Sequence, residues 1–377
     1  MYRLRFSPAL VSALALSAAL SACGSPEPEP ISTDGGVAIV AAPERPMANG
    51  LSVQAIEQAV FAAPQASAPA QAPAPAQPQP GQTPAASTPP AQPAPDMPRA
   101  DLIRAQILLD RSPWSPGAID GLDGVAMKRA VKAFQTASGV TATGELDAAT
   151  FAKLIGSDDR PVLSGYQITA QDVAGPFIGT LPDTTEAKAQ LSALGFATAR
   201  EALAEKFHIT EALLEALNPG VDFARAGQTI VVPAIATAPL SAEVARIEVR
   251  KADGTVAAFD ASNRLLAVYP ATIGSEERPA PSGDLKVVGV ANEPDYTYDP
   301  TRLTYGNGKE KLVVAPGPNN PVGTVWIDLS RDTYGIHGTP EPQEIGKTAS
   351  NGCVRLTNWD AEQLAAAVKP GVDVKFI

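Results

Sequence analysis

The sequence predicts a multidomain protein with a disordered Pro/Ala-rich tether, a small three-helix bundle, an α+β module and a β-rich, sandwich-like C-terminal domain. Three observations support this. The 377 residues suffice for two or three domains. The 37 prolines and 30 glycines exceed the usual share, so part of the chain should be unfolded spacer. After the spacer, the apolar residues first follow helical spacing and later the alternation typical of strands.

Composition excludes several classes of protein. A net charge of −11 argues against binding nucleic acid, whose phosphates need clustered Lys and Arg. Two cysteines exclude a disulfide-dense scaffold and a four-cysteine zinc site. Two histidines, His208 and His337, exclude a multi-histidine metal cluster. We therefore expect neither a metal nor a cofactor.

The N-terminus is predicted to direct export. Residues 1–22 begin with two arginines and contain an apolar run of about 12 residues, which is too short to span a membrane and fits a secretory signal peptide. The following Leu20-Ser21-Ala22-Cys23 resembles the bacterial lipobox, which implies a diacylglycerol on Cys23. Gly24 then implies retention in the outer membrane, facing the periplasm. The alternative is an ordinary signal peptide with a chance cysteine.

Residues 23–99 are predicted to be a disordered linker. The stretch 62–98 is almost only Ala, Pro, Gln, Ser and Thr, which cannot bury enough apolar surface to fold. Residues 51–62 show some helical apolar spacing, which leaves a transient helix or a partner motif open, and we assign neither.

Residues 100–156 are predicted to form the three-helix bundle. Apolar residues recur at helical spacing in 101–110, 124–138 and 147–155, and Asp147 stands where an N-cap is expected. Turn-rich sequence connects the three segments.

This module resembles the peptidoglycan-binding module of cell-wall enzymes. The matching positions are Asp120, Gly121, Phe134, Gln135, Gly144, Leu146, Asp147 and Thr150. The resemblance implies peptidoglycan as a partner. We expect Phe134 and Phe151 in the core and Asp147 as a cap rather than at a binding site.

Residues 164–236 are predicted to be the α+β module. A short strand at 166–169 precedes two short helices at 199–207 and 210–217, and a strand follows at 228–233. This order resembles the LysM fold, which implies recognition of glycans that contain N-acetylglucosamine.

One feature of this module departs from LysM. Residues 172–198 lengthen a connection that is short in that family, so two roles stay open: binding glycan, or only positioning the next domain. His208, at the turn between the two helices, is interpreted as structural or solvent-facing.

Residues 243–377 are predicted to be the β-rich domain. Short alternating segments are separated by Gly, Pro, Asn and Asp turns, and one helix is expected at 358–368 with Thr357 or Asn358 as its N-cap. Within the domain, His337 precedes Cys353 by sixteen residues. Cysteine chemistry needs a neighbouring imidazole and backbone N–H groups for an oxyanion. The alternative is a buried structural cysteine with an unrelated histidine.

The motif H-G…S-x-G-C-V-R-L resembles the signature of the YkuD-type L,D-transpeptidase catalytic domain, and the segments 281–283 and 317–323 resemble its loops. The resemblance implies that Cys353 is the nucleophile and His337 its base. It also implies that the carbonyl of Gly338 orients the imidazole, and that the N–H groups of Gly352 and Cys353 form the oxyanion hole.

The same resemblance implies a substrate-binding set around the nucleophile: Ser350, Asn351, Arg355 and Tyr334. Ser350 and Arg355 would organise the loop or hold a substrate carboxylate, for which the guanidinium fork is suited. Asn351 replaces the histidine of many members, which puts substrate preference in question. Tyr334 would pack near the site.

The implied reaction is acyl transfer in peptidoglycan. The thiolate would attack the diaminopimelate–D-Ala amide of a tetrapeptide stem, release D-Ala and pass the acyl group to an amine to form a 3→3 cross-link. Alternatives with the same chemistry are attachment of an outer-membrane lipoprotein to the wall, or hydrolysis. A rival of another class is a non-enzymatic wall-binding lipoprotein. Acylation of Cys353 by carbapenems would distinguish an enzyme from that rival.

Overall fold

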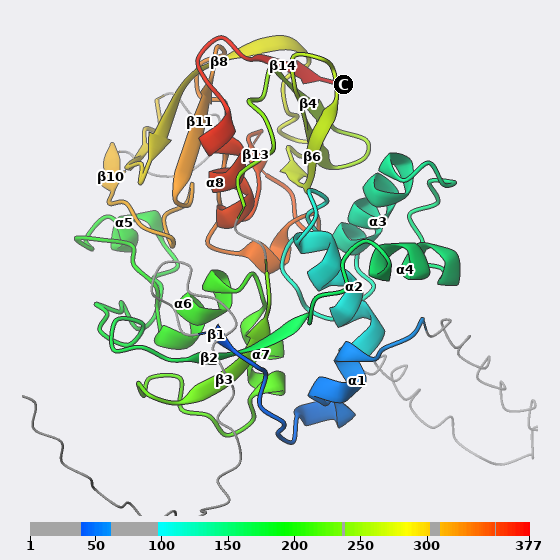
Figure 1. Ribbon diagram of the computed structural model, residues 1–377. Helices are drawn as coiled ribbons and strands as arrows, with labels where there is room; N and C mark the ends of the chain where they lie inside the picture. Colours follow the sequence, from blue (N-terminus) through cyan, green and yellow to red (C-terminus); the bar gives the residue numbers. More distant parts are fainter. Residues whose placement is uncertain (1–38, 62–96, 236–237, 302–309, 351) are drawn as a thin grey trace, which may run out of the picture.

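A computed structural model describes residues 39–61, 97–235, 238–301, 310–350 and 352–377. The predicted signal peptide, Cys23 and Asn351 lie outside these residues. The described chain forms a β-rich domain with two smaller modules packed against one side of it (Figure 1). Among the described residues, no helix has both the length and the apolar character that crossing a membrane would need.

The first module is the expected three-helix bundle: α2 (Ala100–Asp110), α3 (Val125–Ala137) and α4 (Ala148–Ile155). The Asp147 carboxylate accepts a hydrogen bond from the Thr150 N–H at 2.7 Å, so the predicted cap is confirmed. The buried Gln135 amide donates to the Thr143 and Thr150 hydroxyls and accepts from the Gly144 N–H. This one side chain ties α3 to the turn before α4.

The second module contains the predicted strand–helix–helix–strand order. Its elements are β2 (Leu163–Gln167), α5 (Thr185–Lys188), α6 (Ala199–Lys206), α7 (Glu211–Leu217) and β3 (Thr229–Pro233). The Thr210 hydroxyl caps α7 by accepting from the Leu213 N–H. The resemblance to LysM stays a prediction.

The expectation that all of 23–99 is unfolded is wrong for residues 39–61. Strand β1 (Ile39–Val40) adds a third, antiparallel strand to the module through β2, followed by η1 (Ala48–Gly50) and α1 (Val53–Glu57). The Glu57 carboxylate accepts from the N–H groups of Val162 and Leu163 at 3.0 and 2.8 Å. These partners lie more than a hundred residues away, so local composition does not reveal them.

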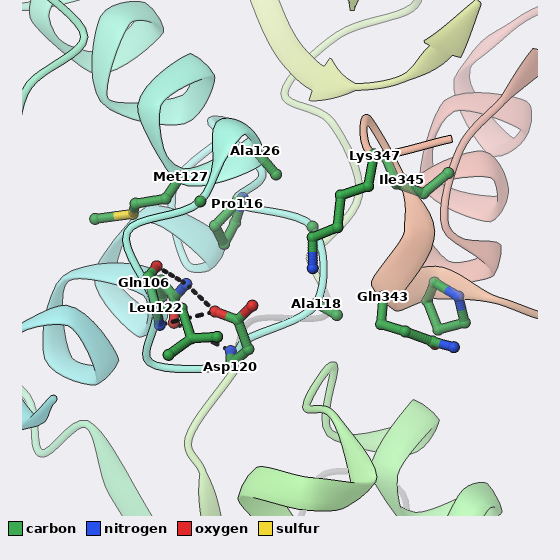
Figure 2. A pocket seen from close by; sticks show the side chains of 13 residues that line it. Gln106, Pro116, Ala118, Asp120, Leu122, Ala126, Met127, Gln343, Ile345 and Lys347 are labelled. Atoms are coloured by element: carbon green, nitrogen blue, oxygen red, sulfur yellow. Dashed lines mark hydrogen bonds between the residues drawn. The ribbon is translucent and has the colours of Figure 1, made fainter. Parts of the chain in front are cut away.

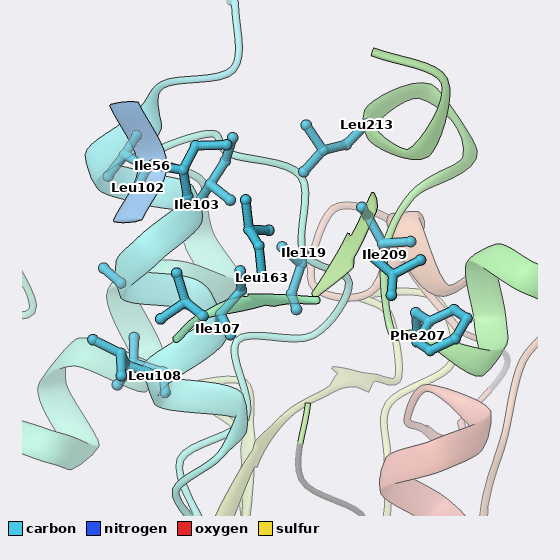
Figure 3. Packing of buried hydrophobic residues seen from close by; sticks show 14 of the residues in the cluster. Ile56, Leu102, Ile103, Ile107, Leu108, Ile119, Leu163, Phe207, Ile209 and Leu213 are labelled. Carbon is cyan, nitrogen blue, oxygen red and sulfur yellow. The ribbon is translucent and has the colours of Figure 1, made fainter. Parts of the chain in front are cut away.

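Residues 39–61 also contribute to a core that the two small modules share. Ile56 is fully buried beside Leu102 and Ile103 of α2 (Figure 3). Backbone hydrogen bonds join Ile119 of the first module to the helix–helix turn of the second: Ile119 N–H to His208 O, and Thr210 N–H to Ile119 O. The two small modules therefore pack against each other as one unit rather than as two independent domains.

The C-terminal domain is β-rich as predicted, and its principal sheet has nine strands in the order β6-β5-β4-β14-β8-β11-β12-β13-β7. The strands are β4 (Arg246–Arg250), β5 (Thr255–Phe259), β6 (Leu265–Pro270), β7 (Thr272–Ile273), β8 (Gly283–Asn292), β11 (Val325–Leu329), β12 (Gly335–His337), β13 (Val354–Arg355) and β14 (Asp373–Phe376). A separate hairpin joins β9 (Tyr296–Tyr298) to β10 (Leu312–Val314).

The two edge strands of this sheet, β6 and β7, are separated only by Ala271. One bent strand therefore supplies both edges, and the sheet is nearly closed on itself rather than a sandwich of two separate sheets. Helix α8 (Asn358–Ala367) packs against β11 and β12, and the Thr357 hydroxyl caps it. Of the two predicted caps, Thr357 is the one observed.

We predict that Ile56→Ala destabilises the protein, because it empties a fully buried site between α1 and α2. Truncation of a buried Ile typically costs about 2–5 kcal/mol. Urea unfolding followed by circular dichroism should show a lower midpoint, whereas the exposed neighbour change Gln54→Ala should stay within about 0.5 kcal/mol. Equal midpoints for both variants would show that residues 39–61 are not part of the core.

Candidate active site

The pairing of β12 with β13 brings the predicted nucleophile and base to one face of the sheet. In this parallel pair His337 lies opposite Arg355, and Cys353 directly precedes β13. Side chains alternate between faces along a strand, so Cys353 and Arg355 share a face, and partner residues of a pair project to the same side. His337 and Cys353 are thus neighbours on one face despite the sixteen residues between them.

His337 is buried, and its orientation is set by its own neighbour in the chain. The ring Nδ1 lies 2.7 Å from the carbonyl oxygen of Gly338. A carbonyl only accepts, so Nδ1 carries the hydrogen and Nε2 keeps its lone pair. Burial, with a smaller contribution from the charge of Arg355, lowers the pKa of His337 to about 4 against the opposing effect of the Gly338 hydrogen bond. At neutral pH the imidazole is an uncharged base.

Cys353 is half-buried, and two backbone groups of the 333–335 segment face its sulfur. Its Sγ lies 3.6 Å from the Thr333 carbonyl oxygen. Burial raises the pKa of the Cys353 thiol, while a hydrogen bond from the Gly335 N–H and the charge of Arg355 partly offset that rise. The thiol and the imidazole are therefore both neutral at neutral pH.

The loop before the cysteine is held by Ser350. Its hydroxyl donates to the Cys353 carbonyl at 2.6 Å and accepts from the Gly274 N–H at 2.6 Å. Because Ser350 is buried and its donor is used within the chain, it organises the loop rather than facing a substrate. Asn351, which follows it, lies outside the described residues.

Gly352 has a φ of 106°, and a Cβ there would stand 3.1 Å from the Tyr334 ring. Only glycine meets both constraints without strain. Tyr334 therefore packs against the backbone that presents Cys353, as predicted, and the Arg331 guanidinium lies 5.2 Å from the centre of its ring. Arg355 is half-buried on the same face as Cys353 and His337.

Trp326 is a site residue that sequence reasoning did not find. It lies opposite His337 in the β11–β12 pair and stacks on the imidazole, with ring centres 5.4 Å apart and planes 22° from parallel. Its ring occupies the space that a Cβ on Gly335 would need, and its Nε1–H donates to the Asp328 carboxylate at 3.2 Å. Strand alternation predicts that Trp326 packs on one side against the domain, but it does not predict that the neighbouring side chain is His337.

A small, open cleft lies between the first module and the segment that joins His337 to Cys353 (Figure 2). One wall is the turn before α3 together with the start of that helix, where Asp120 is held by Gln106. The other wall includes Gln343, Ile345 and Lys347. The module that matches a peptidoglycan-binding domain and the 342–347 segment thus border the same space.

The first module is also anchored next to this loop. The Arg129 guanidinium of α3 fills the space that side chains on Gly254 and Gly346 would occupy. Beside it, the Lys132 ammonium pairs with Asp253 at 3.0 Å. The two glycines lie in the β-rich domain, so their lack of side chains allows the module to dock closely.

His208 has a structural role, one of the two predicted for it. Its ring stacks on Trp359 of α8, with centres 4.8 Å apart, and its Nδ1 lies 2.9 Å from the Asp110 carboxylate of α2. Residues of the first module, the second module and the C-terminal domain meet at this point. Burial there raises the pKa of Asp360 to about 7.

We predict that alkylation of Cys353 keeps accelerating above pH 9, because burial holds the thiol pKa above its ordinary value of 9.0. The thiolate is the reactive form, so the rate should follow its rising population. Iodoacetamide labelling across pH 5–10, with the Cys353 peptide resolved by mass spectrometry, measures this. A rate that is already at its plateau near neutral pH would instead indicate a preformed thiolate–imidazolium pair.

Two parts of the chain match known protein families. Residues 245–376 match the L,D-transpeptidase catalytic domain, and residues 98–154 match a putative peptidoglycan binding domain. Together they cover the predicted catalytic domain and the three-helix module.

Relatives of the chain bear the same description. A putative L,D-transpeptidase YkuD of Bacillus licheniformis is 31% identical over 181 residues, which are 47% of this chain and 92% of that protein. The probable L,D-transpeptidase ErfK/SrfK of Escherichia coli is 33% identical over 171 residues, 44% of this chain and 54% of that protein.

Among solved structures, an L,D-transpeptidase from Xylanimonas cellulosilytica aligns over 77% of this chain and 100% of its own, with 16% identity and a TM-score of 0.34. The L,D-transpeptidase from Mycobacterium smegmatis aligns over 36% of this chain and 59% of its own, with 19% identity and a TM-score of 0.30. With the sequence matches over the domain that carries His337 and Cys353, the chain belongs to the YkuD family of L,D-transpeptidases.

Proposed function

We propose that this protein is a peptidoglycan L,D-transpeptidase that works through an acyl-enzyme on Cys353. The observation that carries the proposal is the placement of Cys353 beside His337, whose Nδ1 is committed to the Gly338 carbonyl. This leaves Nε2 as a free, uncharged base on the face of the sheet that carries the thiol.

The first half-reaction cleaves the donor stem. His337 Nε2 takes the thiol proton as the Cys353 sulfur attacks the carbonyl of the diaminopimelate–D-Ala amide. The N–H groups of Gly352 and Cys353 stabilise the tetrahedral oxyanion. The C–N bond then breaks, His337 returns the proton to the leaving amine, D-Ala departs, and a thioester remains.

The second half-reaction transfers the acyl group. An amine of a second diaminopimelate attacks the thioester carbonyl and His337 takes its proton. The C–S bond then breaks, and His337 passes the proton to the departing sulfur, which regenerates the thiol and the neutral imidazole. The product is a 3→3 cross-link. Arg355, fixed on the same face, is placed to pair with a carboxylate of the stem.

The first module serves as the wall-binding part of this enzyme. Its turn borders the same cleft as the segment between His337 and Cys353, which supports the idea that one strand of peptidoglycan is held by the module and presented to the site. We extend the proposal to the N-terminus: a lipid on Cys23 would hold the enzyme at the outer membrane, on the periplasmic side. Because residues 39–61 pack on the modules, the spacer between the lipid and the folded body would be residues 24–38 rather than 62–98.

We predict that a carbapenem such as meropenem acylates the wild-type protein once, at Cys353. Intact-mass spectrometry should show a single adduct that is absent from Cys353→Ala. His337→Ala should slow acylation by about 10²–10⁴-fold, the usual contribution of a general base. Wild-type protein that forms no adduct would favour the non-enzymatic wall-binding reading.

We also predict that purified enzyme converts tetrapeptide stems into 3→3 dimers with release of D-Ala. Liquid chromatography with mass spectrometry of the muropeptides measures both products. Stoichiometric D-Ala without dimers would assign the acceptor to water or to a lipoprotein lysine instead of diaminopimelate. The Cys353→Ala protein is the matched control, because it keeps the binding surfaces and lacks the nucleophile.

A further inference from the structure

A side chain packs against the residue whose carbonyl orients His337. Asn358, the first residue of α8, is buried against the backbone of Gly323 and Gly338. A Cβ on either glycine would collide with the Asn358 Oδ1 atom. The Asn358 amide therefore forms the wall against which the Gly338 peptide rests.

The orientation of this amide follows from its partners. Its Oδ1 accepts from the Thr324 N–H at 3.3 Å, and its Nδ2 donates to the Pro318 carbonyl at 3.3 Å. An N–H can only donate and a carbonyl can only accept, so the two ends of the amide cannot be exchanged. The remaining and shortest bond runs from Nδ2 to the Glu205 carboxyl at 2.6 Å.

Glu205 comes from outside the catalytic domain, on α6 of the second module. Burial, with smaller contributions from the negative charges of Glu201 on α6 and Glu362 on α8, raises its pKa to about 8 despite the opposing effect of the Asn358 hydrogen bond. The carboxyl is therefore protonated and neutral at pH 7. A neutral acid suits this position, because it can accept from Asn358 without placing an uncompensated charge in a buried joint.

Further hydrogen bonds around the Asn358–Glu205 bond join the second module to the 316–319 loop of the catalytic domain. The Asn319 amide donates to the Glu201 carboxylate at 2.8 Å and to the Gly195 carbonyl at 3.0 Å. The Leu194 N–H donates to the Pro316 carbonyl at 2.8 Å, and the Asn319 N–H donates to the Leu194 carbonyl at 2.9 Å. Glu205 is thus delivered to Asn358 by a docked surface rather than by a lone flexible side chain.

We propose that Glu205 is a positioning residue of the active site: through Asn358 and the Gly338 peptide, it holds the His337 imidazole with Nδ1 protonated and Nε2 free. This inference rests on the proposed function only for its kinetic consequence. It also assigns the second module a task, because that module supplies the shorter of the two acceptor bonds to the Asn358 amide.

The coupling from Glu205 to His337 passes through only the Asn358 amide and the Gly338 peptide. Without the Glu205 acceptor, the Asn358 Nδ2 keeps only the longer bond to Pro318. The amide is then free to shift, and the Gly338 carbonyl loses the wall that aims it at Nδ1. An imidazole without that acceptor populates the other tautomer, which has no lone pair on Nε2 for the thiol proton.

The test compares Glu205→Met, which removes the acceptor at similar volume, with Glu205→Gln, which keeps a neutral acceptor. We expect Glu205→Met to lower kcat for donor acylation about 10–100-fold with KM within about 2-fold, and Glu205→Gln to stay near wild type. Glu215→Gln, an exposed change on α7 of the same module, is the matched control.

A second readout does not depend on activity. The chain has two histidines, so protein labelled with ¹⁵N-histidine gives two resolvable sets of imidazole signals. Wild type and Glu205→Gln should show His337 as the Nδ1–H tautomer, and Glu205→Met should shift it towards Nε2–H. His208, three residues beyond Glu205, should be unchanged in all three; if it moves too, the helix end has been displaced.

Different outcomes would overturn the positioning role and the proposed function. An unchanged His337 tautomer and kcat in Glu205→Met would overturn the positioning role, whereas absence of acylation in wild type would overturn the proposed function instead. If Glu205→Met does not fold by circular dichroism, Glu205→Ala makes the same comparison. A displaced His208, or a Glu205→Gln protein as impaired as Glu205→Met, would reduce Glu205 to a general packing role and overturn the proposal.

Discussion

The bent strand from Leu265 to Ile273 is the constraint on which the catalytic arrangement depends. Its first part forms one edge of the nine-stranded sheet as β6, and its last residues form the other edge as β7. In a flat sheet the two edges would stand about 40 Å apart at the usual strand spacing. Only a sheet that curls nearly closed allows nine adjacent residues to pair at both edges, and this curling also removes most exposed edge N–H and C=O groups.

Closure of the sheet is what places Cys353. Strand β7 pairs with β13, and the next residue, Gly274, exchanges hydrogen bonds with Ser350 through both its N–H and its carbonyl. Ser350 in turn holds the Cys353 carbonyl. The loop that contains Cys353 is therefore attached through these hydrogen bonds to the end of the bent strand. On the other side of β13, β12 carries His337. The geometry of the pair follows from sheet register and from tight glycine backbone, so the loop itself needs little conformational freedom.

The small modules act on this geometry from two sides. Arg129 of the first module fills the space beside Gly254 and Gly346, near the loop that leads to Cys353. Glu205 of the second module reaches Asn358, which supports the peptide behind His337. Because the two modules share a core, they dock as one body, and burial at the joint raises the pKa of carboxyl groups such as Asp360. The wall-binding part of the chain and the chemical part are thus in direct structural contact.

The sequence by itself determined the features whose physics is local. Helices with polar N-caps such as Asp147, Thr210 and Thr357 are predictable, because capping and helical periodicity involve residues within a few positions of each other. Cys353 and His337 are candidates from the sequence because a thiol nucleophile needs a neighbouring base, and the motif that resembles the transpeptidase signature contains both.

Only the tertiary structure decided which distant groups meet. The folding of residues 39–61 onto the modules, the stacking of Trp326 on His337 and the contact of Glu205 with Asn358 join segments far apart in the sequence or on different strands. Such pairs depend on sheet register and on how the modules dock. Side-chain pairing across strands and interfaces leaves no periodic signal in the chain, so a single sequence does not reveal it.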